Sequence, residues 1–375
     1  MKNKKIVIAS DSFKGTLSSL DICCLFQAKT SKMHSISPLF LPIADGGEGS
    51  LEAISNAIDG HFETIEATNL YFQKMRVQFF IDMDNNAYIE TASCDGLTLA
   101  KKDNDPGLTT TYGLGEQIKR AIELGCKNTF LFLGGSASND GGVGLAAALS
   151  VKFFDKDGKT FVPTGSTLKD VNHIDNKEAL ELLKNINITA LSDVASPFYG
   201  KEGAAYKFAP QKGATPEQVE ILDKGLEHLS NIIKKDLSKD VSNIPGAGAA
   251  GGLGGGLIGL INAKISSGIH TLLDLIHFDE VIKEADYVIS GEGKLDRQTL
   301  DGKVIDGVAR RCLKQNKKLI LVVGISEMSL EEIQKQYPCV VSLYETNEKH
   351  LPFDEIKKNA KNDYAFIVEK ILTNL

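Results

Sequence analysis

The chain has 375 residues, which is long for one domain and favours two. Hydrophobic residues make up 42% and charged residues 24% of it, an ordinary balance for a globular enzyme with its own core. The formal net charge of -7 is spread along the chain, which argues against nucleic acid or an anionic membrane surface as a partner, because both attract basic proteins.

Cysteine usage indicates a reducing compartment. None of the six cysteines forms a C-x-x-C pair, and the adjacent Cys23 and Cys24 are poorly placed to bridge. The first apolar run, residues 6–9, is too short for a signal peptide core. No stretch reaches the roughly 18 apolar residues of a membrane span. We therefore expect a cytoplasmic protein.

Both ends of the chain carry the pattern of a parallel sheet. Short apolar runs rich in β-branched residues, each followed by a loop, predict strands at residues 4–9, 37–44, 282–290, 318–324 and 339–344. Amphipathic stretches such as residues 303–315 predict helices between several of them. Strand–loop–helix alternation is typical of a parallel sheet with helices on both faces. We expect a Rossmann-like α/β domain built from residues 1–66 and 276–375.

The middle of the chain, residues 67–275, has different signals. Two pairs of runs flank turn residues and predict β-hairpins: 76–81 with 87–92, and 151–154 with 159–162. Apolar spacing predicts helices at 112–124 and 216–235. We therefore expect an inserted α+β domain, with the active site in the cleft between the two domains.

A first candidate loop, residues 10–15, follows the first strand directly. Ligands of an open parallel sheet bind at the carboxyl ends of its strands. Lys14, with the Ser12 hydroxyl and Gly15 beside it, can hold an anion there. The same residues suit a cap for the next helix, and position alone leaves both interpretations open.

A second loop, residues 44–50, places Asp45 and Glu48 three residues apart among glycines. Carboxylates of this kind can hold Mg²⁺ through its waters or accept a hydroxyl proton. Acidic residues also favour a helix start through the helix dipole. Three glycines among four positions exceed what a cap needs, which favours a functional role.

A third loop, residues 134–144, lies between the apolar strand 129–133 and a helix at 143–149. Free N–H groups at a helix start make such a loop a site for anions, and Asn139 and Asp140 add an amide and a carboxylate. A long helix cap is the alternative. Further on, Asp193 ends the apolar run 188–191, where a solvated loop residue is an equally good interpretation.

A glycine-rich segment, residues 246–256, contains G-x-G-x-x-G at 246–251, and Asp274 follows about 20 residues on, as in the dinucleotide-binding fingerprint. That fingerprint must follow a hydrophobic strand, whereas residues 236–245 are polar and end in Pro245. A small-residue loop against phosphates, or a close-packed helix start, fits better. A last loop, residues 290–299, repeats the theme of acids and glycines and adds Lys294 and Arg297, which can clamp phosphate or carboxylate oxygens.

Several familiar catalytic motifs are absent from the sequence. It has no G-x-x-x-x-G-K-[ST] loop, no protein-kinase motif set, no G-x-S-x-G and no H-E-x-x-H. Phosphoryl transfer needs mainly a backbone cradle, Mg²⁺, a cation and a base for the attacking hydroxyl. The loops alone therefore favour a phosphotransferase without naming its substrate.

As a set, the loops resemble the bacterial glycerate kinase family, of the glycerate 2-kinase type. The resemblance rests on six segments in the family's order, at 11–15, 45–49, 134–142, 211–214, 246–254 and 291–296. It implies transfer of the γ-phosphoryl group of ATP to D-glycerate with Mg²⁺, usually giving 2-phosphoglycerate, by a two-domain α/β enzyme. The chain departs from the family in having Ser10 before Asp11, Ser138 in place of Thr, and residues 68–74 where the family usually has a Pro-Leu-Gly turn.

The resemblance indicates which residues belong to the active site, and we assign a role to each of them as a hypothesis. The catalytic residues are Asp193 as base, Asp45 as the alternative base, and Lys14. Glycerate would be bound by Ser12, Lys14, Asp45 and Arg297, and Mg²⁺ by Glu48 and Asp296. The nucleotide would be bound by Gly134, Gly135, Ser136, Asn139, Asp140, Gly248, Gly251, Gly252, Gly291 and Lys294.

Two other functions are weighed against this one. The first is a nucleotide-dependent oxidoreductase of a small hydroxy acid that uses the glycines at 246–251. The second is a non-catalytic sensor of sugar acids, which the intact acids in every loop disfavour. The expected partners are D-glycerate and ATP, with neither nucleic acid nor membrane, and a homodimer is left open.

Overall fold

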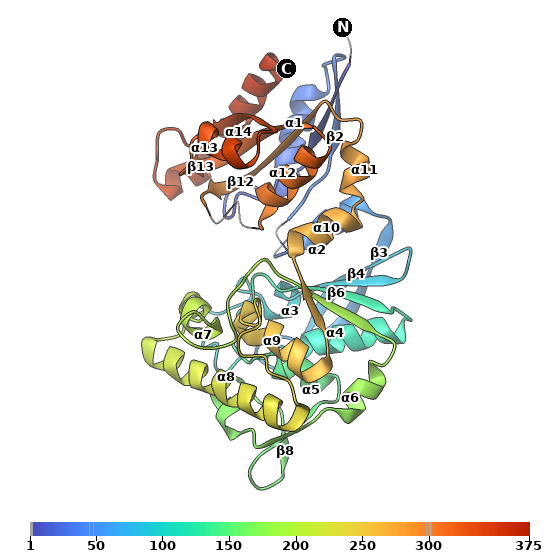
Figure 1. Cartoon of the computed structure of the whole chain (residues 1–375), viewed down its shortest axis with the longest axis vertical. Helices are drawn as coiled ribbons and strands as arrows, with labels where there is room; N and C mark the ends of the chain where they lie inside the picture. The colour runs from blue at the N-terminus through green and yellow to red at the C-terminus, as the bar shows by residue number, and fades with distance from the viewer. Residues whose placement is uncertain (1–2, 45, 48, 298, 300–301) are drawn as a thin grey trace. The chain divides into compact units, whose positions relative to one another are not determined.

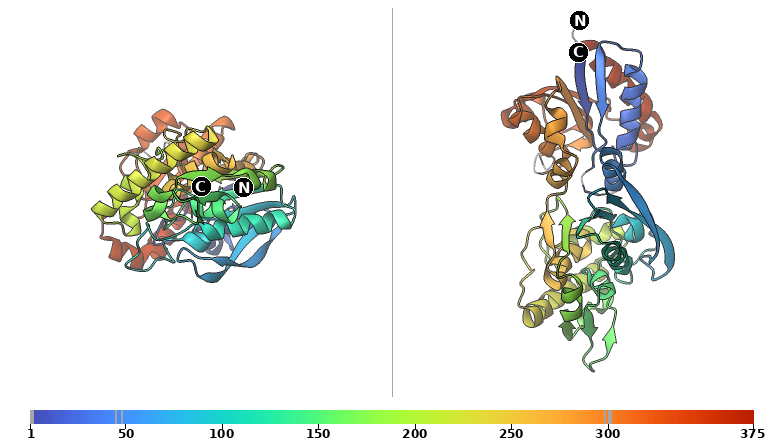
Figure 2. Two further views of the ribbon diagram at one scale, coloured as in Figure 1. Left: turned by 90° about the horizontal axis from the view of Figure 1, so that it is seen from below. Right: turned by 90° about the vertical axis from the view of Figure 1, so that its right-hand side faces the viewer.

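The computed structural model describes residues 3–44, 46–47, 49–297, 299 and 302–375. The chain divides into two compact units, each described here by itself. Unit 1 consists of Met1–Asp45, Glu52–Ile58 and Ser267–Leu375, and unit 2 of Gly46–Leu51 and Asp59–Ser266. Both ends of the chain thus belong to unit 1 (Figures 1 and 2).

Unit 1 is built on a sheet of five strands, all parallel, in the order β14-β13-β12-β1-β2. Every strand predicted at the chain ends is present, and the two-domain α/β fold class is confirmed. Two of the predicted ranges were wrong. β2 ends at Phe40 rather than 44, and β12 runs from Tyr287 to Leu295 rather than from 282 to 290, because Ile282 ends helix α11. The strands are β1 (Lys4–Ile8), β2 (Ile36–Phe40), β12 (Tyr287–Leu295), β13 (Lys318–Ser326) and β14 (Val340–Glu345).

Helices cover the sheet of unit 1. Ile22 and Phe26 of α1 and Tyr364 of α14 are fully buried in one cluster with Ile6 and Ile289 of the strands (Figure 1). Side chains of this size stabilise a fold by about 1.5–3 kcal/mol each when fully buried. The unit's helices are α1 (Ser19–Thr30), α2 (Ser50–Ala57, whose first two residues belong to unit 2), α10 (Gly268–Leu275), α11 (Phe278–Ile282), α12 (Val304–Lys314), α13 (Leu330–Gln336) and α14 (Phe353–Asn374).

Unit 2 contains a six-stranded mixed sheet in the order β11-β10-β6-β5-β4-β3. β3, β4 and β5 pair antiparallel, whereas β5, β6, β10 and β11 run parallel. The first predicted hairpin is confirmed as β4–β5, with Phe80 opposite Tyr88. The strands are β3 (Gly60–Thr68), β4 (Lys74–Asp82), β5 (Asn86–Glu90), β6 (Asn128–Phe132), β10 (Asn187–Leu191) and β11 (Lys264–Ser266).

A small antiparallel sheet, β8-β7-β9, completes the strands of unit 2. It contains the second predicted hairpin, formed by β7 (Lys152–Phe154) and β8 (Thr160–Phe161), next to β9 (His173–Asp175). The unit's helices are α3 (Ala92–Asp95), α4 (Tyr112–Glu123), α5 (Val143–Ala148), α6 (Lys177–Leu182), α7 (Ala204–Phe208), α8 (Pro216–Leu237) and α9 (Ala249–Ile261), with 3-10 turns at Gly165–Asp170 and Pro210–Lys212.

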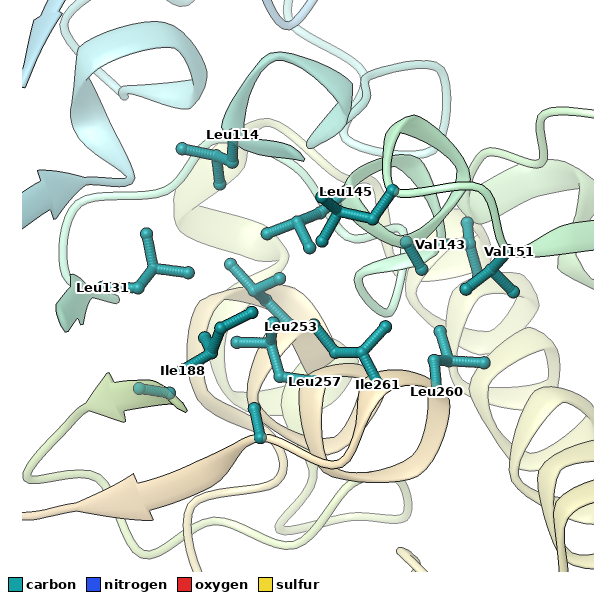
Figure 3. Packing of buried hydrophobic residues seen from close by; sticks show 14 of the residues in the cluster. Leu114, Leu131, Val143, Leu145, Val151, Ile188, Leu253, Leu257, Leu260 and Ile261 are labelled. Carbon is teal, nitrogen blue, oxygen red and sulfur yellow. The ribbon is translucent and has the colours of Figure 1, made fainter. Parts of the chain in front are cut away.

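The core of unit 2 lies between the mixed sheet and its helices. Figure 3 shows Leu131 of β6 and Ile188 of β10 beside Leu253 and Leu257 of α9, with Leu145 of α5 close by. This packing fixes the loops that leave the carboxyl ends of β6 and β10. Within the ranges that the structure describes, none of the helices has both the length and the apolar character of a membrane span.

Candidate active site

In unit 1, the loop after β1 and the end of β12 meet in an open pocket. The prediction of a loop at 290–299 was wrong for residues 290–295, because these continue β12 and pair with β13. The volume of the pocket is about 310 Å³. Its lining combines three carboxylates and three ammonium groups: Asp11, Ser12, Lys14, Glu292, Gly293, Lys294, Asp296 and Lys303. We call it the polar pocket. Groups of both signs around one hollow suit a ligand that brings phosphate or carboxylate oxygens together with a cation.

Hydrogen bonds hold the loop after β1 to strand β12. The Asp11 N–H donates to Gly291 O at 3.0 Å, and the Ser10 hydroxyl donates to the same oxygen at 3.1 Å. A Cβ at Gly291 would lie 1.7 Å from Val322 O of β13. The close approach of β13 is therefore sufficient reason for glycine at position 291. The predicted role of Gly291 in nucleotide binding stays a prediction.

Asp296 carries its charge at neutral pH. Burial raises the pKa of Asp296, but the Thr299 N–H, which donates to its Oδ1 at 3.0 Å, and the charges of Lys303 and Lys294 outweigh burial, so that its pKa lies below the ordinary value. Carboxylate oxygen is the ligand that Mg²⁺ prefers, and Mg²⁺ in kinases is shared between one or two carboxylates and the substrate phosphates. Asp296 therefore fits the predicted role as a metal ligand.

Lys294 forms two ion pairs at the surface of the polar pocket. Its Nζ lies 2.8 Å from Glu327 Oε1 and 3.5 Å from Asp296 Oδ2, and the hydrogen bond to Glu327 raises the pKa of Lys294. Exposed ion pairs are weak because solvent and salt screen them. The ammonium group can thus exchange Glu327 for an anionic ligand at small cost.

The other residues predicted for this site differ in whether they line the polar pocket. Lys14 is exposed and lines the polar pocket, whereas Arg297 is exposed and is not part of the described lining. Asp45 and Glu48 lie outside the described residues. Across the described ranges, no three His, Cys, Asp or Glu side chains are grouped as they would be in a metal site made by protein alone.

In unit 2, the described part of the second loop lies against the third. The Gly134 N–H donates to Gly46 O at 3.3 Å, and a Cβ at Gly134 would lie 2.2 Å from Gly47 Cα. Gly134 therefore has a structural reason to be glycine. Gly135 has φ of 77°, in the left-handed region that glycine adopts without strain.

Asp140 holds the third loop in shape. Its side chain is fully buried and accepts hydrogen bonds from Thr111 N and Oγ1 at 2.9 Å, from Gly142 N at 2.9 Å and from Gly144 N at 3.2 Å. Burial raises the pKa of Asp140, and these donors offset the rise only in part. For Asp140 the geometry favours the capping alternative, because its oxygens face the chain's own N–H groups.

The side chain of Asn139, unlike that of Asp140, is not hydrogen-bonded to any part of the chain that the structure describes. It is fully buried, yet its Oδ1 and Nδ2 have no hydrogen-bond partner among the described residues. Leaving a buried polar group unsatisfied costs about 1–3 kcal/mol. An amide kept in this state indicates a ligand or an ordered water, which agrees with the binding role predicted for Asn139.

Sequence reasoning missed a buried network beneath the third loop. Lys212 is 3% exposed, and its Nζ donates to Ser136 Oγ at 2.7 Å and to Ser138 O at 2.6 Å. Asp95 is fully buried and accepts from Ser138 Oγ at 2.6 Å. Asn104 extends the network by donating to Lys212 O at 2.8 Å.

The charges of this network are strongly perturbed. Burial raises the pKa of Asp95 to about 8, and the charge of Lys212 only partly offsets it. Burial likewise lowers the pKa of Lys212 to about 8 against the charge of Asp95. Perturbed groups of this kind concentrate at functional sites. One signal was available: Asp95-Gly96 follows β5 as the other acid–glycine loops follow their strands.

The glycine-rich segment packs on the third loop. Residues 250–252 have left-handed backbone angles at the start of α9, and the Gly141 N–H donates to Gly251 O at 3.1 Å. A Cβ at Gly251 would lie 2.2 Å from Ser138 O, and one at Gly248 2.3 Å from Pro197 O. Gly252 is buried against Leu226 and Phe198. These contacts favour the close-packed helix start over a dinucleotide site.

The parallel strands bring the remaining groups to one edge. β10, β6 and β5 are neighbours in the sheet. Half-buried Asp193, the third loop and buried Asp95 follow their carboxyl ends in that order. This edge is where open parallel sheets bind ligands. Unit 2 therefore presents an acid, a glycine loop and a buried charge network side by side.

Comparison with known proteins decides the family. The sequence profile of the glycerate kinase family matches residues 6–375. The chain belongs to the glycerate kinase family. It is 39% identical to a glycerate kinase of Haemophilus influenzae over 85% of each chain, and 38% identical to the glycerate 2-kinase of Escherichia coli over 85% of each. The crystal structure of a candidate glycerate kinase 2 from Salmonella typhimurium LT2 superposes with a TM-score of 0.83, at 33% identity, over 100% of this chain and 98% of that one.

Membership of the glycerate kinase family confirms the resemblance inferred from the loops. It also confirms the predicted class of enzyme, a phosphotransferase whose acceptor is an alcohol group.

Proposed function

We propose that the protein transfers the γ-phosphoryl group of ATP to D-glycerate with Mg²⁺ and forms 2-phosphoglycerate. The observation that carries this proposal is the position of the family's segments at the carboxyl ends of parallel strands, after β1 and at the end of β12 in unit 1, and after β6 and β10 in unit 2. Support for the substrate and the product comes from the names of the relatives, among them the glycerate 2-kinase of Escherichia coli.

The polar pocket supports the roles proposed for unit 1. Lys14 and Ser12, with Arg297, would bind the glycerate carboxylate or a phosphate, and Lys294 a phosphate of ATP. Asp296, with Glu48, would hold Mg²⁺, which when bound neutralises phosphate oxygens. The presence of Ser12, Lys14, Lys294 and Asp296 around one pocket supports this division of roles.

In unit 2 the third loop and the start of α9 would cradle phosphates through their N–H groups and the Asn139 amide. The residues proposed to contribute are Gly134, Gly135, Ser136, Gly248, Gly251 and Gly252. Asp140, predicted to bind the nucleotide directly, would act instead by holding the third loop in shape. The support is the close packing of the two segments on each other, together with the hydrogen bonds from Lys212 to the third loop. Preorganised donors stabilise transferring phosphoryl groups because they need no rearrangement during the reaction.

The base that accepts the hydroxyl proton is proposed to be Asp193, with Asp45 as the alternative. The variants Asp193→Asn and Asp45→Asn keep size and remove basicity, and loss of a general base typically costs 10²–10⁴-fold in turnover. Asp157→Asn, in the exposed β7–β8 turn, is the matched control. If both variants keep the turnover of the control, the base is elsewhere.

A steady-state assay tests the function itself. Release of ADP is measured with D-glycerate, ATP and Mg²⁺, and again without D-glycerate. We expect ADP release that depends on both D-glycerate and Mg²⁺. If ADP release does not rise above the reaction without acceptor, the proposal is wrong. A D-glycerate-dependent change in nicotinamide absorbance would instead support the oxidoreductase alternative.

A further inference from the structure

Unit 1 contains a second, apolar pocket next to the polar one. Its volume is about 190 Å³. It lies after the carboxyl ends of β1 and β14 and beside the end of β13, and α14 forms its outer wall. Its apolar lining consists of Phe13, Leu17, Ile325, Phe353, Ile356 and Ala360. Small-molecule sites are mostly apolar and aromatic, with a few polar groups that orient the ligand.

Two residues join the apolar pocket to the polar one. Lys14 and Gly293 line both. A Cβ at Gly293 would have its nearest neighbour at 3.6 Å, so the backbone there leaves room at the junction. A ligand can therefore place an apolar part against α14 and an anionic part beside Lys14, Lys294 and Lys303.

We propose that the apolar pocket binds the purine base of the nucleotide, with the phosphates directed into the polar pocket. This inference rests on the proposed function for the identity of the ligand. A nucleotide has the two halves that the two pockets require: a flat base with apolar faces and a polyanionic tail. The smaller pocket suits one base and is too small for a whole nucleotide.

Phe353, the first residue of α14, supports this assignment. The residue is 54% exposed and lines the apolar pocket, so that part of its ring is open to a ligand there. The ring lies against Gly15, where a Cβ would come within 2.9 Å of Phe353 Cζ. Glycine at position 15 thus leaves room for the ring at the pocket beside Lys14. A base stacked on this ring would bury the apolar face that is now exposed.

The loop that presents Phe353 is already fixed. Asn347 N donates to Gly324 O at 3.0 Å, and Asn347 Oδ1 accepts from Leu351 N at 2.8 Å. Thr346 N donates to Val323 O at 2.9 Å, and Thr346 lines the pocket, where its hydroxyl can meet a polar edge of the base. A preformed wall lowers the entropy cost of binding.

The test compares two phenylalanines of one helix. Phe353→Ala removes the proposed stacking partner, and Phe366→Ala, 64% exposed and not part of the pocket lining, is the matched control. Base–aromatic stacking of this kind corresponds to a loss of about tenfold or more in affinity. We expect Phe353→Ala to raise the Michaelis constant for ATP by about tenfold and that for D-glycerate far less, and Phe366→Ala to change neither.

Calorimetry without an acceptor separates this inference from the proposed function. We expect adenosine and ADP to bind the wild type about tenfold more tightly than Phe353→Ala, and inorganic triphosphate to bind both equally. Ile356→Trp, which fills the pocket, is expected to weaken adenosine binding as well. Equal adenosine binding by all variants, or no binding by the wild type, would overturn the base pocket. A wild type that binds ADP but does not phosphorylate D-glycerate would leave the pocket standing and refute the function.

Discussion

Replacing Lys212 by Met tests whether the buried network holds the third loop. The methionine keeps the length and apolar stem of lysine and removes its charge. In the wild type, Nζ is enclosed and donates to Ser136 Oγ at 2.7 Å and Ser138 O at 2.6 Å. The substitution removes both hydrogen bonds and the positive charge that faces Asp95.

The size of the effect follows from these contacts. Hydrogen bonds to charged groups contribute about 1.5–3 kcal/mol each. Removing one partner of a buried charge pair costs about 3–5 kcal/mol when the other charge remains. That penalty does not apply in full, because burial raises the pKa of Asp95 to about 8, so that its carboxyl is mostly protonated at pH 7 already. We therefore expect a local loss of about 3 kcal/mol, which corresponds to two lost hydrogen bonds at the lower end of their range.

Hydrogen–deuterium exchange of the peptide covering residues 134–142 measures this loss where it occurs. A change of about 3 kcal/mol corresponds to exchange faster by about 100-fold, provided that exchange reports the opening equilibrium. Lys207→Met, an exposed lysine of α7, is the control and is expected to leave the peptide unchanged. If the two variants exchange alike, the network does not support the loop.

Three further outcomes follow from single contacts. In the folded protein the pKa of Asp95 is raised to about 8 from 3.8. Its contribution to stability is therefore complete below about pH 4 and is lost as the pH rises towards 8, by at most about 1.4 kcal/mol per pH unit. Asp95→Asn should remove this pH dependence of the free energy of unfolding, measured with urea at pH 5.5–7.5. Gly291→Ala should destabilise by about 1–3 kcal/mol or more, because its Cβ meets Val322 O, whereas Gly293→Ala should not; thermal unfolding of both compares them. Asn139→Leu should leave the melting temperature equal or higher while lowering turnover, since it replaces an unsatisfied amide by an apolar side chain.

Much of the fold could be predicted from local patterns. The five strands of unit 1 are short apolar runs, and such runs with loops after them have few other interpretations. The start of β12 was misplaced because Ile282 is as apolar as a strand residue, although it packs at the end of α11. Periodicity cannot separate the two over a few residues.

The candidate site was predicted less completely. Loops with several glycines and acids are visible in a sequence, and the polar pocket unites two of them. Asp95 was missed, and Lys212 received no role although it lies in the segment 211–214 that supports the resemblance. Only the pairing of β5 with β6 and the turn at Pro210–Lys212 bring the two beneath the third loop. The reason for each glycine was also hidden, because a close approach such as that of Gly251 to Ser138 O depends on packing between distant segments.

Phosphorus NMR of the reaction product tests the central claim most directly. The protein is incubated with D-glycerate, ATP and Mg²⁺, and the spectrum is compared with those of 2-phosphoglycerate and 3-phosphoglycerate. We expect the resonance of 2-phosphoglycerate to grow as that of the ATP γ-phosphate declines. A spectrum without any phosphoglycerate would contradict the assignment of the protein as an ATP-dependent kinase of glycerate, and 3-phosphoglycerate alone would contradict the proposed product.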